Sequence, residues 1–187
     1  MTDNLIEQLQ KLYPNAELSK PELETYFRLR QLKKNETLLD LHSVCRQYYF
    51  VNKGALRVFF LKDGQEYTSW FAFENYFFTE LESYTRSSFS NYCIVAIEET
   101  EIIEINRSDM DVLLARYDWW KDFLIQHQQQ AMLKLTEVIK SFQAQSAKDR
   151  YEDLFNYPYF FQRTRQKDLS TMIGITRHSL SRLRNKK

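Results

Sequence analysis

The side chains best suited to chemistry with a partner lie at the carboxyl end of this chain. Residues 163–187 hold eight basic residues and one acid, a net charge of +7, so residues 1–162 carry −6 of a whole-chain +1. Dense guanidinium and ammonium groups pair with phosphates, and phosphate neutralisation dominates the affinity of proteins for DNA. Charge alone fits a solvated basic tail equally well, so the apolar pattern inside the segment must separate the two interpretations.

An apolar framework runs through this basic segment. Two helical faces follow one another, the first made by Leu169, Met172 and Ile173 and the second by Leu180 and Leu183. Gly174 between them predicts a left-handed turn that ends the first helix, Ile175 fills the angle, and the small Ser170 fits a close approach of the helices. A plain helical hairpin would also need this framework, but not the excess of basic groups on its second helix. The pattern therefore favours a DNA-reading helix-turn-helix.

The second of these helices presents the candidate DNA contacts. Thr176 is a suitable N-cap, which leaves the following polar residues exposed near the amino end of the helix. Residues at these positions reach base edges when such a helix enters the major groove. The predicted DNA-binding residues are Thr176, Arg177, His178, Ser181, Arg182, Lys186 and Lys187.

The elements upstream predict a strand-rich domain and a long helix. Leu5, Leu9 and Leu12 lie at helical spacing within the first 25 residues, and short strands follow at about 28–33, 36–41, 46–52, 55–62, 65–72, 92–98 and 101–105. Gly54 and Gly64 fall where hairpin turns need positive φ. So many short strands favour a sandwich or barrel. We expect domains at 1–112 (barrel), 113–145 (helix) and 146–187 (helix-turn-helix).

The residues after Asn106, a possible helix cap, continue without Gly or Pro to Asn156. Apolar side chains on one stripe recur there in steps of three, four and seven: Leu124, Ala131, Leu135, Val138 and Phe142. One interpretation is a helix that packs on its own barrel. The stripe is narrow and the opposite face polar, so we favour pairing with a second copy in a homodimer.

Composition limits the remaining classes of function. The chain is 43% hydrophobic and 27% charged, with no apolar run near the roughly 20 residues that span a bilayer, so we expect a cytoplasmic protein that does not contact a membrane. Cys45 and Cys93 are too far apart for a zinc ribbon and are expected to be reduced, buried thiols. His42, His127 and His178 are scattered, so we predict neither a metal site nor a cofactor, and no enzymatic activity.

Two segments of the chain carry a resemblance to a known family, Arg177-His-Ser-Leu-Ser-Arg182 and Lys148-Asp-Arg-Tyr-Glu-Asp-Leu-Phe. The first is similar to the recognition helix, and the second to the helix that opens the DNA-binding domain, of the Crp/Fnr (cyclic-AMP receptor) family of transcription regulators. Leu81-Glu-Ser83 through Ala96-Ile-Glu-Glu-Thr-Glu-Ile-Ile103 is most similar to a Bacteroidetes-type branch. The resemblance implies an α+β fold, with an antiparallel cyclic-nucleotide-binding-like barrel (jelly roll), a long dimerisation helix and a carboxyl-terminal helix-turn-helix.

The same resemblance defines a candidate effector pocket and a set of partners. Family members that bind cyclic nucleotides hold the ribose with Gly-Glu and the phosphate with Arg-Ser or Arg-Ala, and the matching places here are Thr79-Glu80 and Ser90-Asn91. Glu80, Ser90 and Asn91 are therefore the pocket candidates, but the missing arginine argues against cyclic AMP. Arg86 is nearby, and an unknown small-molecule effector remains a candidate. The implied partners are a palindromic double-stranded operator, RNA polymerase and a second copy of the chain.

The resemblance also assigns Arg177 and Arg182 to base or phosphate contacts. His178 departs from it, because many relatives carry Glu there, so a preferred base sequence does not follow. Two other classes of function compete with a regulator. One is a barrel-only ligand-binding or interaction protein with an incidental basic tail, and the other is a cupin-like enzyme, which needs clustered His and carboxylate ligands.

Overall fold

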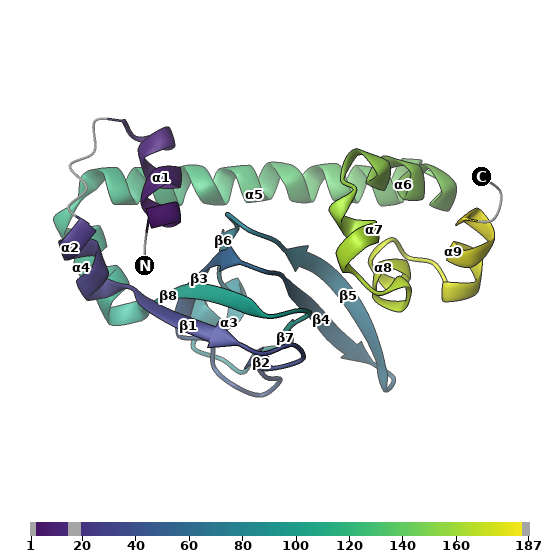
Figure 1. The fold of residues 1–187 in the computed structure, drawn as a ribbon, viewed down its shortest axis with the longest axis horizontal. Helices are drawn as coiled ribbons and strands as arrows, with labels where there is room; N and C mark the ends of the chain where they lie inside the picture. The colour runs from purple at the N-terminus through teal and green to yellow at the C-terminus, as the bar shows by residue number, and fades with distance from the viewer. Residues whose placement is uncertain (1–2, 15–19, 185–187) are drawn as a thin grey trace.

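The computed structural model describes residues 3–14 and 20–184 and has a β-sandwich at its centre. Figure 1 shows two sheets, one long helix along one side of them, and short helices at both ends. Both sheets are antiparallel and four-stranded, with strand orders β1-β8-β3-β6 and β2-β7-β4-β5. The strands are β1 (Arg28–Leu32), β2 (Thr37–Leu39), β3 (Gln47–Lys53), β4 (Leu56–Lys62), β5 (Gln65–Ala72), β6 (Phe77–Phe78), β7 (Cys93–Ala96) and β8 (Thr100–Asn106).

The strand prediction was right for seven of these strands to within a few residues. It missed the two-residue β6, and the strands form two packed sheets rather than the closed barrel that we expected. The jelly-roll character of the prediction holds, because the eight strands are divided between the sheets in the order of a jelly roll and each sheet buries one face against the other. Leu56, Val58, Ile94 and Ile102 are fully buried in the core between them.

Two glycines turn the chain where the sequence predicted hairpins. Asp63 (φ 53°) and Gly64 (φ 75°) both adopt positive φ, so the β4–β5 loop has the twist that suits a two-residue hairpin. Gly54 has φ 90°, and a Cβ there would lie 2.7 Å from the Cα of Thr100. Its neighbour Ala55 exchanges two hydrogen bonds with the Thr100 hydroxyl. Backbone freedom and close approach thus both require glycine at position 54.

Short helices lie at the two ends of the sandwich, and one long helix runs along one side of it (Figure 1). The helices are α1 (Asp3–Leu12), α2 (Lys20–Tyr26), α3 (Leu81–Arg86), α4 (Arg107–Arg116), the long α5 (Asp118–Ala144), α6 (Ala147–Asp153), α7 (Tyr159–Arg163), α8 (Gln166–Met172) and α9 (Arg177–Arg184), with a 3-10 turn, η1 (Leu154–Asn156). Asn106 caps α4 by accepting from the amide of Asp109, as its position predicted. The helical stretch after Asn106 is interrupted at Tyr117, whose extended backbone separates α4 from α5.

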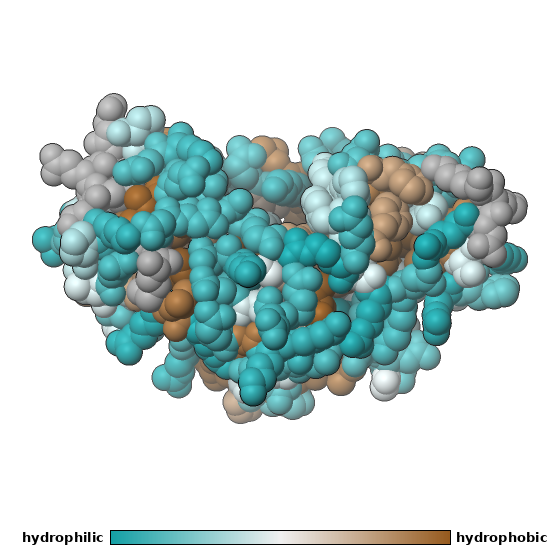
Figure 2. All heavy atoms as spheres, in the orientation of Figure 1, coloured by the Kyte–Doolittle hydropathy of each residue, from teal (hydrophilic) through white to brown (hydrophobic). Residues whose placement is uncertain are grey.

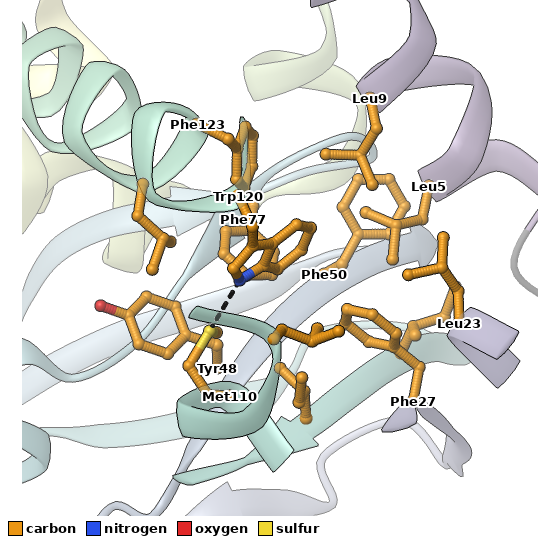
Figure 3. Close-up of a cluster of buried hydrophobic side chains, with 14 of the residues drawn as sticks. Leu5, Leu9, Leu23, Phe27, Tyr48, Phe50, Phe77, Met110, Trp120 and Phe123 are labelled. Carbon is orange, nitrogen blue, oxygen red and sulfur yellow. Dashed lines mark hydrogen bonds between the residues drawn. The ribbon is translucent and has the colours of Figure 1, made fainter. Parts of the chain in front are cut away.

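The first turns of α5 are anchored in a core shared with α1, α2 and α4. Trp120 is fully buried, and its indole Nε1 donates to the sulfur of Met110 at 3.0 Å (Figure 3). Phe123 and Leu124 are buried beside it, and Leu5 and Leu9 of α1 close the cluster. The amino-terminal half of α5 is therefore part of the sandwich domain, whereas residues 131–140 are exposed along their whole length.

Candidate nucleic-acid interface

The helices α8 and α9 form one small unit through shared apolar contacts. Leu169 of α8, Ile173 directly after it and Leu180 of α9 are all buried in one cluster. Ser170 is 2% exposed, in agreement with the predicted close approach of the helices. The sequence therefore predicted the framework of this unit correctly.

The turn between α8 and α9 has the predicted left-handed residue. Gly174 adopts φ 73°, and the amide of Ile175 donates to the carbonyl of Ser170 at 3.0 Å, which closes the end of α8. Thr176 then caps α9, because its hydroxyl oxygen accepts from the amide of Ser179 at 3.1 Å. A Cβ at Gly174 would also come within 2.8 Å of the Phe142 ring, a close approach that the sequence did not reveal.

The polar residues predicted to contact DNA lie on the open side of α9. Thr176, Arg177, His178, Ser181 and Arg182 are all exposed, whereas Lys186 and Lys187 lie outside the described residues. Within the described ranges no carboxylate is close enough to Arg177 or Arg182 to form an ion pair with it. The two guanidinium groups therefore keep their donors available to a partner.

A groove runs between the amino end of α9 and the tip of the β4–β5 hairpin. Its volume is about 660 Å³, with Gln65 and Tyr67 of β5 on one side and Thr176, Arg177 and Ser179 on the other. The amino end of α9 is thus close to the sandwich but not covered by it, and in Figure 1 α9 lies at the end of the molecule opposite α1 and α2.

The α8–α9 unit is attached to the end of α5 through Arg150 of α6. The guanidinium donates from Nε to the carbonyl of Ile173 at 3.0 Å and from Nη1 to that of Gln145 at 2.7 Å, and it lies 4.7 Å from the centroid of the Phe142 ring. Ser146 and Asp149 form a capping box that starts α6. These contacts connect the end of the long helix directly to the turn that precedes α9.

A second attachment joins α8 and α7 to the sandwich, and sequence reasoning missed it. Arg57 of β4 pairs with Asp168 of α8, and Arg163 at the end of α7 pairs with Glu74 and Glu98 on two loops of the sandwich. The signal available in the sequence was a charged residue inside the apolar strand Ala55-Leu-Arg-Val-Phe. Its partner could not be identified, because the pairing depends on the tertiary fold.

The candidate effector residues are engaged within their own loop. Glu80 is 5% exposed and caps α3, since its carboxylate accepts from the amides of Glu82 and Ser83. The hydroxyl of Ser90, 2% exposed, donates to the carbonyl of Tyr92 and accepts from its amide. Asn91 is exposed. Neither buried group presents a free polar atom to a ligand in this conformation.

Aromatic side chains occupy the space between β6 and α5. Phe77 stacks on Tyr48 with ring centroids 5.2 Å apart, and it also contacts Phe123 and His127 of α5. Burial raises the pKa of Tyr84, which packs edge-on against Tyr48, to about 12, and burial lowers the pKa of His127. The side chains of Tyr84 and His127 are both partly buried and pack against the core. Arg86 is exposed and pairs with Glu82, on the surface of α3.

The residues predicted for a dimer seam are divided by the structure. Leu124 is 8% exposed and packs into the core of its own domain, so it differs from the predicted role at an interface. Ala131, Leu135, Val138 and Phe142 are exposed, the last three by 59%, 50% and 47%. Packing on its own domain therefore holds for the amino-terminal half of α5, whereas pairing of the exposed half with a second copy stays a prediction.

Cys45 and Cys93 are free and buried, as expected, and burial raises the pKa of the Cys93 thiol to about 11. In residues 3–14 and 20–184, no three His, Cys, Asp or Glu side chains are placed to share a metal ion. None of the described helices combines the length and the apolarity needed to cross a membrane. Figure 2 shows a mainly hydrophilic face, with hydrophobic atoms reaching the surface over α6 and α7.

Comparison with known proteins agrees with this architecture. Residues 29–117 match the family model of the cyclic nucleotide-binding domain. This range begins in β1 and ends at Tyr117, directly before α5. No curated protein matches the chain at a significant level.

Solved structures with a similar fold cover most of the chain. CooA from Carboxydothermus hydrogenoformans, solved as a mutant, has a TM-score of 0.73 at 16% identity, covering 95% of this chain and 83% of that chain. FixK2 from Bradyrhizobium japonicum has a TM-score of 0.72 at 15% identity, covering 86% and 83%. A putative transcriptional regulator of the Crp/Fnr family from Eubacterium rectale has a TM-score of 0.72 at 15% identity, covering 96% and 87%.

Identities this low establish the fold and leave activity open. None of these findings addresses the Bacteroidetes branch, which stays a prediction. Residues 29–117 are therefore similar to the cyclic nucleotide-binding domain, and the chain shares its fold with solved structures that include a putative Crp/Fnr regulator.

Proposed function

We propose that this protein is a dimeric, sequence-specific DNA-binding transcription regulator whose sandwich domain does not bind cyclic AMP. The observation that carries the proposal is the open face of α9. Arg177 and Arg182 are exposed there without a carboxylate partner within the described residues, on a capped helix that follows a buried two-helix framework. Exposed donors of this kind are what recognition of bases and phosphates requires.

The two arginines have different tasks in this proposal. They are five residues apart on one helix, so their side chains point about 140° away from each other. Arg177 lies in the first turn, where it can form a bidentate contact with guanine in the major groove. Arg182 lies further along the helix, where a base or a flanking phosphate is within reach. Lys186 and Lys187 would add phosphate contacts that do not depend on sequence.

A second copy of the chain completes the proposed DNA-binding surface. Leu135, Val138 and Phe142 expose large apolar side chains on a helix that is otherwise polar, and such a stripe is stabilised by burial against a copy of itself. Two recognition helices related by a two-fold axis read half-sites about 34 Å apart, so the operator should be a palindrome. The domain boundaries at 112 and 145 belong to the same proposal. RNA polymerase is a further partner that fits a regulator of this fold.

The proposed lack of cyclic AMP binding follows from the state of Glu80 and Ser90. Both are buried and use their polar atoms within their own loop, and the phosphate-holding arginine of nucleotide binders is absent. A phosphate buried there would lose a charge-assisted contact worth about 1.5–3 kcal/mol. A different effector, or none, is the remaining possibility for this domain.

Selection of duplexes from a random pool tests the proposal directly. The full chain should enrich a palindromic motif whose half-sites are one helical turn apart, and nuclease footprinting should show protection of both halves. A protein that enriches no motif, although its sandwich is folded, would instead be the barrel-only interaction protein. Its binding to DNA would then fall equally for all sequences as salt is raised.

A further inference from the structure

A buried polar contact joins β4 to α8, the helix that precedes the proposed recognition helix. Arg57 is 5% exposed and Asp168 is 4% exposed, and Nη2 of the arginine lies 3.3 Å from Oδ1 of the aspartate. Nη2 makes no hydrogen bond within the described residues, so this contact is an ion pair alone. On the sandwich side, Nε donates to the hydroxyl of Thr68 at 2.8 Å and Nη1 donates to the carboxylate of Glu66 at 2.7 Å. One guanidinium thus ties two strands of the sandwich to α8.

Uncharged contacts between β5 and α8 lie beside this ion pair and hold α8 in the same orientation against the sandwich. The amide of Thr68 donates to the hydroxyl oxygen of Thr171 on α8 at 3.1 Å, and the two threonine hydroxyls are also 3.1 Å apart. β5 is an edge strand of its sheet, so α8 protects an amide that would otherwise face water. Lys167 adds a longer contact to Glu66 at 3.7 Å.

Burying the Arg57–Asp168 ion pair costs desolvation energy, which suggests that the pair serves to position α8 more than to stabilise the fold. A buried ion pair is seldom more stabilising than apolar side chains of the same volume, but breaking it leaves an uncompensated charge in the interior. Such a pair therefore penalises positions of α8 that separate the two charges. Because Arg177, His178 and Arg182 stay exposed in this position, docking of α8 is compatible with reading of DNA by α9.

We infer that Arg57 is a positioning residue for DNA recognition, which fixes α8, and through it α9, against the sandwich domain. This inference rests on the proposed function. In a dimer the distance between the two recognition helices depends on where each α8 sits, and a palindrome demands one spacing. The contact of Arg150 with Ile173 and Phe142 holds the other side of the unit. On the sandwich side, Arg57 acts together with the Thr68–Thr171 contacts and with Arg163 of α7, and it is the buried charge among them that reaches α8.

Hydrogen exchange of the full chain without DNA tests the docking step. Arg57→Met should speed exchange of the Thr68 amide by about tenfold or more, because Asp168 is left buried without its partner. Asp168→Asn, which lies outside the sandwich and leaves the Arg57 contacts to β5 intact, should give a smaller increase. In the double variant the Thr68 amide should exchange more slowly than in Arg57→Met alone, since the stranded carboxylate is removed.

Arg86→Met, at an exposed ion pair, is the matched control and should leave exchange of the Thr68 amide unchanged. Unchanged Thr68 exchange in both single variants would overturn the inference.

Binding to the selected palindrome and to a scrambled duplex tests the positioning step. Asp168→Asn should weaken binding to the palindrome by about tenfold and leave the scrambled duplex unaffected, because only specific binding needs the fixed spacing. Moving the half-sites apart by one base pair should reduce the difference in affinity between the wild type and Asp168→Asn. Equal losses on both duplexes, or tighter binding to the palindrome, would overturn the inference. If the wild type selects no motif, the proposed function fails, and the exchange data show separately whether the docking contact exists.

Discussion

Two groups of polar side chains in this protein differ in burial and in whether their hydrogen-bonding groups are already used. Glu80 and Ser90, the candidate effector residues from the sequence, are buried and bonded to nearby backbone atoms. Arg177 and Arg182 on α9 are exposed, and no carboxylate among the described residues pairs with them. A polar group whose hydrogen-bonding capacity is used internally is structural, whereas one that is left open is available to a ligand. We therefore expect ligand binding at the carboxyl-terminal α8–α9 unit and not at Glu80 and Ser90 of the sandwich.

The largest effect is expected at the turn that aims α9. Gly174→Ala should destabilise the α8–α9 unit by about 3 kcal/mol, because the new Cβ meets both a left-handed backbone and the Phe142 ring. Duplex binding should be lost, while fluorescence of the buried Trp120 stays native.

Gly64→Ala is the matched control for this turn. It has a similar φ of 75°, but no atom lies within 4 Å of its added Cβ, so it carries backbone strain alone. Equal destabilisation of the two variants would show that the contact with Phe142 does not matter.

The exposed half of α5 should give the next largest effect. Leu135→Glu should split the dimer, because each copy loses the burial of a leucine worth about 2 kcal/mol and gains a charge at the seam. Sedimentation should then report a monomer in which the sandwich is still folded. Gln130→Glu adds the same charge off the seam and should leave the dimer intact. A monomeric wild type, or a dimeric Leu135→Glu, would contradict the assignment.

A smaller effect on stability is expected at Glu80, the buried N-cap of α3. Glu80→Ala should lower the free energy of unfolding by about 1–2 kcal/mol, because α3 loses its N-cap. Glu82→Ala removes only an exposed pair on the same helix and should stay within about 0.5 kcal/mol of the wild type. Urea unfolding measures both. If Glu80→Ala matched the wild type in stability, Glu80 would be free for a ligand and the contrast between the two sites would be lost.

The smallest expected effect is that of cyclic AMP on the wild type. At millimolar nucleotide, thermal unfolding should not shift, since a ligand stabilises only in proportion to its binding of the native state. A shift that saturates at micromolar nucleotide would contradict the structural role of Glu80 and Ser90. It would also direct attention to Arg86 as the phosphate-binding group.

Local rules explain why much of the fold was predictable from the sequence. The positive φ of Gly64 and Gly174 and the capping by Asn106 and Thr176 depend on neighbours along the chain, and all four predictions are confirmed. The break at Tyr117 was not predictable, because it uses neither Gly nor Pro.

The missed features depend on contacts between distant segments. The pairing of Arg57 with Asp168 and the burial of Leu124 in its own domain depend on how the elements pack, which periodicity does not reveal. For the candidate site, the sequence identified the residues of α9 and their exposure. It did not show what fixes that helix in space.

Binding of Arg177→Ala to the selected palindrome and to a scrambled duplex, across a salt series, tests the central claim most directly. The variant should lose about 1–3 kcal/mol per half-site on the palindrome and little on the scrambled duplex, because a bidentate contact to guanine discriminates between bases. Lys186→Ala is the comparison, and it should weaken both duplexes alike and flatten the salt dependence. Equal losses on both duplexes for Arg177→Ala would contradict the account, since Arg177 would then contact phosphate and not read sequence.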